Sequence, residues 1–476
     1  MTIHPRGRRD LLKWTATGAL LAPVFSSTEM LEAATQAKSP AAPHHAVSPT
    51  APAPPRVTLN VRDYGATGDG TTKDTIALQE TIERCAVFGG GLAVVPAGKY
   101  LTGTLALRSG VTLHLEKDAE LLGSPDMADY PLAQIRWEGR WRQGYSALIV
   151  AMDAEHIGIT GPGSISGSMA VRGRVDRATQ RRLPALIEIT NCRNVRVEDC
   201  TTTQYGMWSI HPTYCENIVF RNLVVNSGAD GIDVDSCRHV VIDGCTFSTG
   251  DDCISLKSGR GMEGNTIARP TEDVTITRCS FADSHFACIG IGSETSAGIR
   301  NVRVEDCKFT GARSHAVYIK SRVGRGAFIE NIAMNNLDIS GVRQGFLRLN
   351  FMNSGKQDEF PVPGEAGIPT VRNFSFTNVR VHDVPMLVQA TEISARKPLL
   401  GFTLANVTGT CGKGIFLANV HQAVLRNIKV TGYEGALLHT ANVSGMGLNG
   451  AVAIVADALP KAPEVVPEPE TPYKLH

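Results

Sequence analysis

The feature that most constrains this chain is a short segment that recurs from about residue 156 onward. Each copy begins with a turn residue, usually Asn or Asp, continues with alternating apolar residues and often closes with Cys. The copies begin at Asn194, Asn217, His239, Asp273, Asn301, Asn331, Asn373 and Asn427. The first two intervals are 23 and 22 residues, and the later ones are longer. Short strands at such a period predict a solenoid, in which each coil buries its apolar face against the next.

The type of solenoid follows from what lies between the strands. No helical pattern of comparable length separates them, which disfavours leucine-rich and ankyrin arrays and leaves an all-β parallel β-helix. Before the repeats, Asp74 is a candidate N-cap of a helix. Its apolar positions would be Ile76, Leu78, Ile82 and Cys85. We expect this helix to cap the N-terminal end of the β-helix.

The two ends of the chain differ in composition from its middle. Arg8 and Arg9 precede a modest apolar run, which resembles a twin-arginine export signal of a bacterium and predicts a periplasmic or extracellular protein. The alternative is a basic leader without this role. The run is too short for a permanent membrane span. We therefore predict an export signal at 1–37, a Pro- and Ala-rich linker at 38–56, a single β-helix domain at 57–459 and a Pro-rich tail at 460–476.

Charge and cysteine content narrow the class further. The 47 basic and 46 acidic residues give a net charge of +1, which argues against a nucleic-acid partner. Cysteines two residues before a turn residue, or closing a repeat, would stack on neighbouring coils as a buried ladder of small apolar side chains. They are Cys192, Cys215 and Cys237, and Cys200, Cys245, Cys279 and Cys307. Disulfides are the alternative, and we expect the protein to be a monomer.

Two motifs, at 230–237 and 250–259, contain five aspartates. Asp230 lies 21 residues before Asp251, close to one coil, so Asp230 and the pair Asp251 and Asp252 should lie side by side on adjacent coils. Carboxylates crowded together repel, and one of them tends to keep its proton. Glycoside hydrolysis needs such a pairing of a protonated acid with an ionised base. The alternative is that these aspartates satisfy turn backbones.

The motifs resemble those of the polygalacturonase family of glycoside hydrolases. The resemblance covers roughly residues 57–440 and rests on these two motifs, on Ile-Gly-Ser-Glu at 291–294, on Tyr-Ile-Lys-Ser at 318–321, on the segment 211–217 and on Asp-Tyr-Gly-Ala at 63–66. It implies a single-stranded, right-handed parallel β-helix that hydrolyses pectic polysaccharide with inversion and without a metal or another cofactor. By resemblance, Asp251 is the general acid, and Asp230 and Asp252 activate water. Gly228 stands where the family carries Asn.

The resemblance also suggests supporting residues. His285 is the candidate for a histidine that supports the acid, and His211, in one of the motifs, is a candidate substrate-binding residue. Lys320 matches a family lysine, while the part of the family's arginine would pass to Tyr318 or Arg322. Lysine and arginine at the cleft, including Lys257, would pair with the carboxylates of a uronate substrate.

Three alternatives stay open. In the first, the substrate is rhamnogalacturonan rather than galacturonan. In the second, the reaction is elimination, with Ca²⁺ held by the carboxylates and an arginine as base. In the third, the solenoid binds glycans without catalysis. The sequence leaves exo or endo action undecided.

Overall fold

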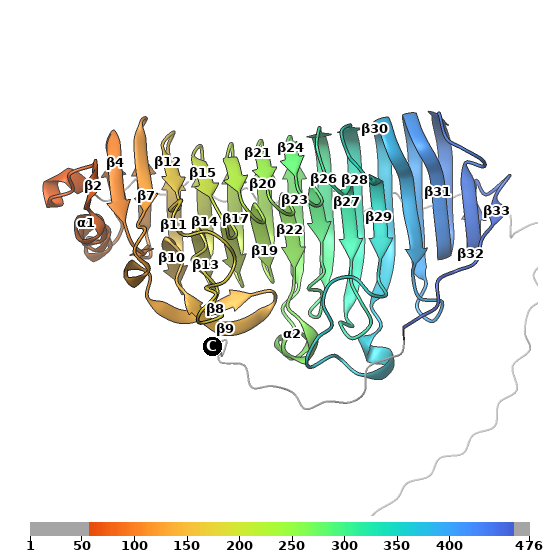
Figure 1. Cartoon of the computed structure of the whole chain (residues 1–476), viewed down its shortest axis with the longest axis horizontal. Helices are drawn as coiled ribbons and strands as arrows, with labels where there is room; N and C mark the ends of the chain where they lie inside the picture. Colours follow the sequence, from red (N-terminus) through yellow and green to blue (C-terminus); the bar gives the residue numbers. More distant parts are fainter. Residues whose placement is uncertain (1–56, 461–476) are drawn as a thin grey trace, which may run out of the picture. The chain divides into compact units, whose positions relative to one another are not determined.

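A computed structural model describes residues 57–460 of this protein. In this part of the chain, 31 strands pair into one parallel sheet that winds coil upon coil, so the fold is a parallel β-helix, as the repeat predicts. Figure 1 shows the strands following one another in chain order. The predicted export signal, most of the linker and most of the tail lie outside the described residues. The right-handed sense stays a prediction.

Strands that stack on successive coils form three ladders. The first ladder carries the site described below and consists of β5 (Leu105–Ala106), β10 (Ile149–Met152), β13 (Ile187–Thr190), β16 (Ile210–Thr213), β19 (Ile232–Asp235), β22 (Ile254–Lys257), β25 (Ile289–Ile291), β27 (His315–Lys320) and β29 (Gly345–Asn350). The second consists of β1 (Thr58–Asn60), β3 (Gly91–Val95), β6 (Val111–Leu115), β11 (Glu155–Thr160), β14 (Arg193–Glu198), β17 (Glu216–Arg221), β20 (Arg238–Asp243), β23 (Thr271–Thr277), β26 (Ile299–Phe309) and β28 (Phe328–Ile339). The third consists of β2 (Asp69–Lys73), β4 (Gly98–Thr102), β7 (Ala119–Gly123), β12 (Ser164–Ser166), β15 (Thr201–Gln204), β18 (Val224–Ser227), β21 (Thr246–Thr249) and β24 (Ser280–Ser284).

The remaining elements complete or decorate the coils. Long strands finish the stack: β30 (Thr370–Glu392), β31 (Leu399–Thr431), β32 (Leu438–Met446) and β33 (Val452–Ala453). A separate antiparallel hairpin is made of β8 (Leu132–Trp137) and β9 (Arg140–Tyr145). The helices are α1 (Thr75–Val87), α2 (Gly261–Ile267) and the short 3-10 turns Val61–Tyr64, Met127–Asp129 and Gly364–Gly367. No helix within residues 57–460 is long and apolar enough to cross a membrane.

The turn residue of each repeat has a left-handed backbone. All eight predicted turn residues have φ between 51° and 60°, a conformation that Asn and Asp tolerate better than most residues. Their side chains form a ladder along the coils, for example from Asn331 Nδ2 to Asn301 Oδ1 at 2.9 Å and from Asn373 Nδ2 to Asn331 Oδ1 at 2.9 Å. The recurring Asn therefore fixes both the turn and its contact with the next coil.

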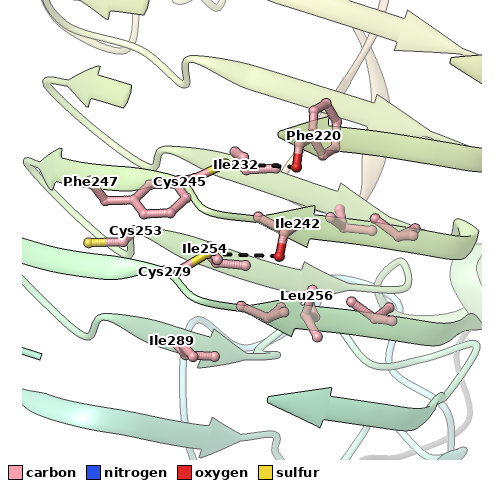
Figure 2. Packing of buried hydrophobic residues seen from close by; sticks show 14 of the residues in the cluster. Phe220, Ile232, Ile242, Cys245, Phe247, Cys253, Ile254, Leu256, Cys279 and Ile289 are labelled. Atoms are coloured by element: carbon pink, nitrogen blue, oxygen red, sulfur yellow. Dashed lines mark hydrogen bonds between the residues drawn. The ribbon is translucent and has the colours of Figure 1, made fainter. Parts of the chain in front are cut away.

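Like residues stack inside the coils. Ile232, Ile254 and Ile289 occupy the same register position on three successive strands, and Figure 2 shows them in the core beside Cys245 and Cys279. The rings of Phe247, Phe281 and Phe309 stack at 5.4 and 4.7 Å between centroids. All 11 cysteines are buried free thiols. Cys215 Sγ accepts from the N–H of Cys192, and Cys237 Sγ accepts from the N–H of Cys215, which confirms the predicted ladder for this set.

Helix α1 agrees with the prediction in extent but not in every residue. Leu78, Ile82 and Cys85 are buried, and the helix contacts β1, β3, β5 and β6. Ile76 is 81% exposed, because two residues before Leu78 is the opposite side of a helix. Asp74 does precede the helix, but its carboxylate accepts from the backbone N–H groups of Thr67 at 2.7 Å and Gly68 at 3.0 Å rather than from the helix. The role of helix α1 as an N-terminal cap of the β-helix stays a prediction.

Candidate active site

The coil register places the aspartates of the two motifs side by side. Ile232 of β19 pairs with Ile254 of β22, a step of 22 residues, so Asp230 is equivalent to Asp252 on the next coil. Asp230 therefore lies beside the pair Asp251 and Asp252 on the adjacent coil, as expected. Within the pair, Asp252 is the stacked partner, and Asp251 lies just before it on the turn.

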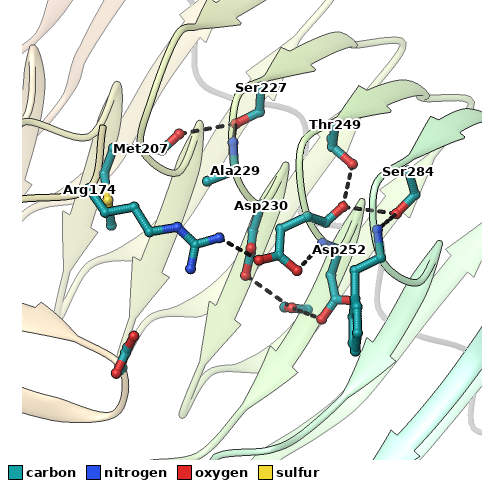
Figure 3. Close-up of polar contacts among 12 residues, drawn as sticks. Arg174, Met207, Ser227, Ala229, Asp230, Thr249, Asp252 and Ser284 are labelled. Atoms are coloured by element: carbon teal, nitrogen blue, oxygen red, sulfur yellow. Dashed lines mark hydrogen bonds and ion pairs between the residues drawn. The ribbon is translucent and has the colours of Figure 1, made fainter. Parts of the chain in front are cut away.

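Asp230 and Asp252 are buried and joined by polar side chains. The Ser255 hydroxyl lies 3.3 Å from Asp230 Oδ2 and 3.0 Å from Asp252 Oδ2. Lys257 Nζ donates to Asp230 Oδ2 at 3.0 Å, and Lys320 Nζ donates to Asp252 Oδ2 at 2.8 Å. Each buried carboxylate thus has its own lysine, and a serine lies between the two. Figure 3 shows Asp230 and Asp252 beside one another.

The two carboxyl groups differ in acidity. Burial opposes ionisation of Asp230, but the charge of Lys257, hydrogen bonds from Asp233 and Lys257 and the charge of Arg174 together outweigh it and hold the pKa of Asp230 below its usual value. Burial raises the pKa of Asp252 to about 6, because Lys320 offsets it only in part while Asp230 and Asp251 add to it. Near neutral pH the site therefore holds one firmly ionised carboxylate beside one that titrates close to the working range.

A third buried aspartate lies beside Asp230. Asp233 is fully buried, with Oδ1 2.5 Å from Lys257 Nζ. Burial and the neighbouring charge of Asp230 hold the pKa of Asp233 well above its usual range. Lys257, whose pKa stays high despite burial because of these two carboxyl groups, lies 4.4 Å from the ring centre of Trp208. Asp233 thus supports Asp230 through Lys257.

Asp251 is the accessible member of the group. Its side chain is 28% exposed and forms an ion pair with the guanidinium of Arg174. Its backbone carbonyl accepts from the Thr249 hydroxyl at 2.7 Å and from the Ser284 hydroxyl at 2.9 Å, so the turn that carries it is held from two coils. A general acid must reach the glycosidic oxygen of a substrate, and Asp251, an accessible carboxyl group beside two buried ones, is placed to do so.

Glycines make room for the carboxylates. A Cβ at Gly290 would lie 2.3 Å from Asp252 Oδ2, so a larger residue there would displace the carboxylate. A Cβ at Gly228 would lie 2.5 Å from the carbonyl oxygen of Tyr205. This close contact explains why Gly228 cannot be the Asn that the family resemblance leads one to expect.

Three segments outside the coils surround these aspartates. They are the tip of the β8–β9 hairpin, the loop 167–186 between β12 and β13, and the segment 351–369. With strand residues they line a pocket formed by Glu138, Arg174, Trp208, Asp230, Asp251, Asp252, Lys257, Arg260, Gly292, Ser293, Glu294, Lys320, Arg325, Gly355 and Lys356. In Figure 1 the hairpin, α2 and the segment before β30 extend from the same side of the stack.

Ion pairs join two of these walls. Glu138 at the hairpin tip lies 3.3 Å from Arg260 and 3.5 Å from Lys356. Asp358 of the segment 351–369 binds Arg260 Nε at 2.8 Å and Arg325 Nε at 2.5 Å. The hairpin and the segment are thus connected by ion pairs at the pocket.

Of the predicted binding residues, Lys257 and Lys320 line the pocket. His285, the histidine predicted to support the acid, does not: its Nε2 accepts from Arg313 Nη2 at 2.9 Å and lies 3.6 Å from Asp283. The neighbouring Phe286 faces the site instead, with Lys320 Nζ 4.5 Å from its ring centre.

His211, Tyr318 and Arg322 also lie outside the pocket lining. His211 is buried, with Nδ1 3.5 Å from Glu188 and its ring against Trp208, and burial lowers its pKa. The Tyr318 hydroxyl lies 3.3 Å from that of Ser354. Arg322 donates to the carbonyl oxygen of Gly355. These three side chains hold the surroundings of the pocket rather than its surface.

Sequence reasoning missed most of the walls. Arg174, Glu138, Arg260 and Glu294 were not singled out as site residues. Glu294 belongs to a quoted motif, so its position was a usable signal. Arg174 and Glu138 lie in irregular segments without a repeat, so no pattern could place them.

Metal binding is a separate question. Within residues 57–460 no three or more His, Cys, Asp or Glu side chains form a group that could hold a metal ion. The aspartates of the pocket are instead interleaved with lysine and arginine. Metal-independent chemistry stays a prediction.

A parallel β-helix whose pocket gathers aspartates among lysine and arginine side chains is typical of solenoids that act on polysaccharides. Comparison with known proteins identifies the family. Residues 92–420 match the model of "Glycosyl hydrolases family 28", and the chain belongs to this family; residues 58–117 match "Rhamnogalacturonase A/epimerase, pectate lyase-like". The chain is therefore a glycoside hydrolase.

Individual relatives agree with this assignment. The chain is 29% identical to a "Probable polygalacturonase" of Vitis vinifera, over 73% of each chain. It is 28% identical to an exo-poly-alpha-D-galacturonosidase of Dickeya chrysanthemi, over 73% of this chain and 66% of that protein. Among solved structures, the exopolygalacturonase of Thermotoga maritima matches with a TM-score of 0.71 and 26% identity, over 80% of this chain and 93% of that one.

Proposed function

We propose that this protein is an exported, exo-acting polygalacturonase that removes single galacturonate units from the end of a pectic chain by inverting hydrolysis. The observation that carries the exo mode is the connected wall. Glu138, Arg260, Asp358 and Lys356 join the hairpin to the segment 351–369. We infer that this wall closes one end of the pocket. A cleft closed at one end admits a chain terminus, whereas an open one admits a chain interior. The exo-acting relatives named above are consistent with this mode.

The substrate follows from the charge of the pocket. Lys257, Arg260, Lys320, Arg325, Lys356 and Arg174 are cationic lining residues. A polymer with a carboxylate on every sugar complements this set, because charge-assisted hydrogen bonds to carboxylates are among the stronger polar contacts. The same lining also holds five carboxyl groups, so the cations available to a substrate are those with the most exposed ion pairs, Arg174 and Lys356.

The chemistry uses three carboxyl groups. Asp251, which is accessible, donates its proton to the oxygen of the leaving sugar. A water molecule attacks the anomeric carbon, and Asp230 with Asp252 accepts the proton that the water loses. The glycosidic bond breaks, and each product gains a hydroxyl group. Asp230 suits the base role because Lys257 keeps it ionised.

The exo mode is tested with hexagalacturonate labelled at its reducing end. We expect galacturonate and labelled pentagalacturonate as the first products, followed by shorter labelled chains in order. Early labelled di- and trigalacturonate would exclude exo action. Proton NMR of the fresh product tests inversion: the β-anomer of galacturonate should appear first, and a first α-anomer would show retention.

Export is tested separately, because the predicted signal lies outside the described residues. In a bacterial host with a twin-arginine pathway, we expect the full chain outside the cytoplasm. A variant with Arg8 and Arg9 both replaced by Lys should accumulate inside. Equal distribution of the two proteins would contradict the proposed signal.

A further inference from the structure

The contact between Arg174 and Asp251 differs from the other ion pairs of the pocket. Lys320, Lys257 and Arg325 are paired with carboxylates whose side chains are at most 7% exposed. The Arg174 and Asp251 side chains are 44% and 28% exposed. Exposed pairs contribute little free energy, whereas breaking a buried pair is costly. Among the cations paired with Asp230, Asp251 and Asp252, Arg174 is therefore the one that can most readily change its partner.

The loop that carries Arg174 is anchored by contacts within the loop and by an ion pair to strand β13. Val175 bridges Arg182, and Leu183 N–H donates to the Arg174 carbonyl at 3.0 Å, so the loop folds back on itself. Arg182 is almost fully buried and donates to Glu188 Oε2 at 2.8 Å. The backbone at Arg174 is thus held in place, while its side chain reaches toward the aspartates (Figure 3).

His211 belongs to this anchor. Its Nδ1 lies 3.5 Å from Glu188 Oε1, the carboxylate that also binds Arg182. His211, which was predicted to bind substrate, therefore contacts Glu188, the carboxylate that anchors the loop through Arg182.

Because Arg174 is paired with Asp251, the position of Asp251 determines which sugar of a substrate Arg174 can bind. If Asp251 protonates the leaving oxygen, the sugar beside Asp251 is the leaving sugar. In a galacturonan this sugar carries a carboxylate that competes with Asp251 for the guanidinium. An ion pair favours the ionised form of a carboxyl group, whereas an acid catalyst must carry a proton.

We propose that Arg174 is a specificity-determining residue that exchanges Asp251 for the carboxylate of the leaving sugar, an inference that rests on the proposed function. The exchange binds the substrate and releases Asp251 from the guanidinium as the glycosidic oxygen arrives. The enzyme thereby selects a chain whose penultimate sugar is an unesterified uronate.

The test compares digalacturonate with the same disaccharide methyl-esterified on its reducing-end sugar. Both need protonation of the leaving oxygen, but only the first presents a carboxylate there. We expect wild-type kcat/KM to be roughly tenfold or more higher for digalacturonate, from the strength of a hydrogen bond to a charged group. Arg174→Gln should lose this preference and cleave both at the rate of the ester, and Arg174→Lys should keep part of it.

Controls separate the possible failures. Arg181→Gln changes the same charge in the same loop, at a side chain that contacts Gln143 at 3.2 Å outside the pocket lining, and should leave the preference intact. Equal losses on both disaccharides in Arg174→Gln, or no change on either, would overturn the inference. Failure of the wild type to cleave digalacturonate would instead overturn the proposed function.

Discussion

At the scale of residues, the site depends on how two stacked carboxyl groups are made unequal. Asp230 and Asp252 occupy equivalent positions on adjacent coils, yet Lys257 lowers the pKa of one while burial raises that of the other to about 6. The sequence placed these aspartates near one another. It could not show the difference between them, because that difference arises from side chains of other coils.

Substitution of the acid tests the assigned roles. Asp251→Asn and Asp230→Asn should each lower kcat on digalacturonate by about a hundred- to ten-thousand-fold, the typical contribution of one acid or base group. Circular dichroism should show an intact fold. On a nitrophenyl galacturonide, whose leaving group departs without protonation, Asp251→Asn should regain most of its activity and Asp230→Asn should not. Equal defects on both substrates would contradict the acid role of Asp251.

The raised pKa of Asp252 predicts a pH dependence. If Asp252 must be ionised to help activate water, kcat/KM should rise with pH through about 6. Lys320 lowers the pKa of Asp252, so Lys320→Gln should move this acidic limb to higher pH. The matched control is Lys308→Gln, at an exposed lysine of β26, which should leave the profile unchanged. A limb that stays in place in Lys320→Gln would exclude Asp252 as its origin.

At the scale of elements, the coil turns were the most predictable feature. The eight turn residues recognised in the sequence all have left-handed backbones. A repeat reveals such positions because every coil imposes the same conformation. The β8–β9 hairpin and the loop 167–186 occur once each, so their contacts depend on tertiary packing alone. Arg174 and Glu138 were missed for this reason.

The ladder of turn asparagines predicts a graded effect on stability. Asn331 has φ of 56° and hydrogen bonds to Asn301 and Asn373. Asn331→Ala should lower the free energy of unfolding by about 2 kcal/mol, from the left-handed backbone and the lost hydrogen bonds. Asn331→Gly should cost less, because glycine adopts this backbone freely. Denaturant unfolding of both variants measures the order, and an equal loss would contradict the role of the backbone.

At the scale of the whole molecule, the repeat and the motifs were enough to predict the fold and the reaction class. The repeat and the motifs did not predict which side chains line the pocket. His285, Tyr318 and Arg322 lie in or beside the motifs, but their side chains face Asp283, Ser354 and Gly355, respectively. The walls come instead from segments inserted between coils. The solenoid positions the carboxyl groups, and the insertions define what reaches them.

The most direct test of the central claim is incubation of the protein with polygalacturonate and, separately, with rhamnogalacturonan, followed by sizing of the products. The account predicts galacturonate as the sole early product from polygalacturonate and no release from rhamnogalacturonan. Release from rhamnogalacturonan alone, a ladder of oligomers, or unsaturated uronides that vanish when a chelator is added would each contradict it.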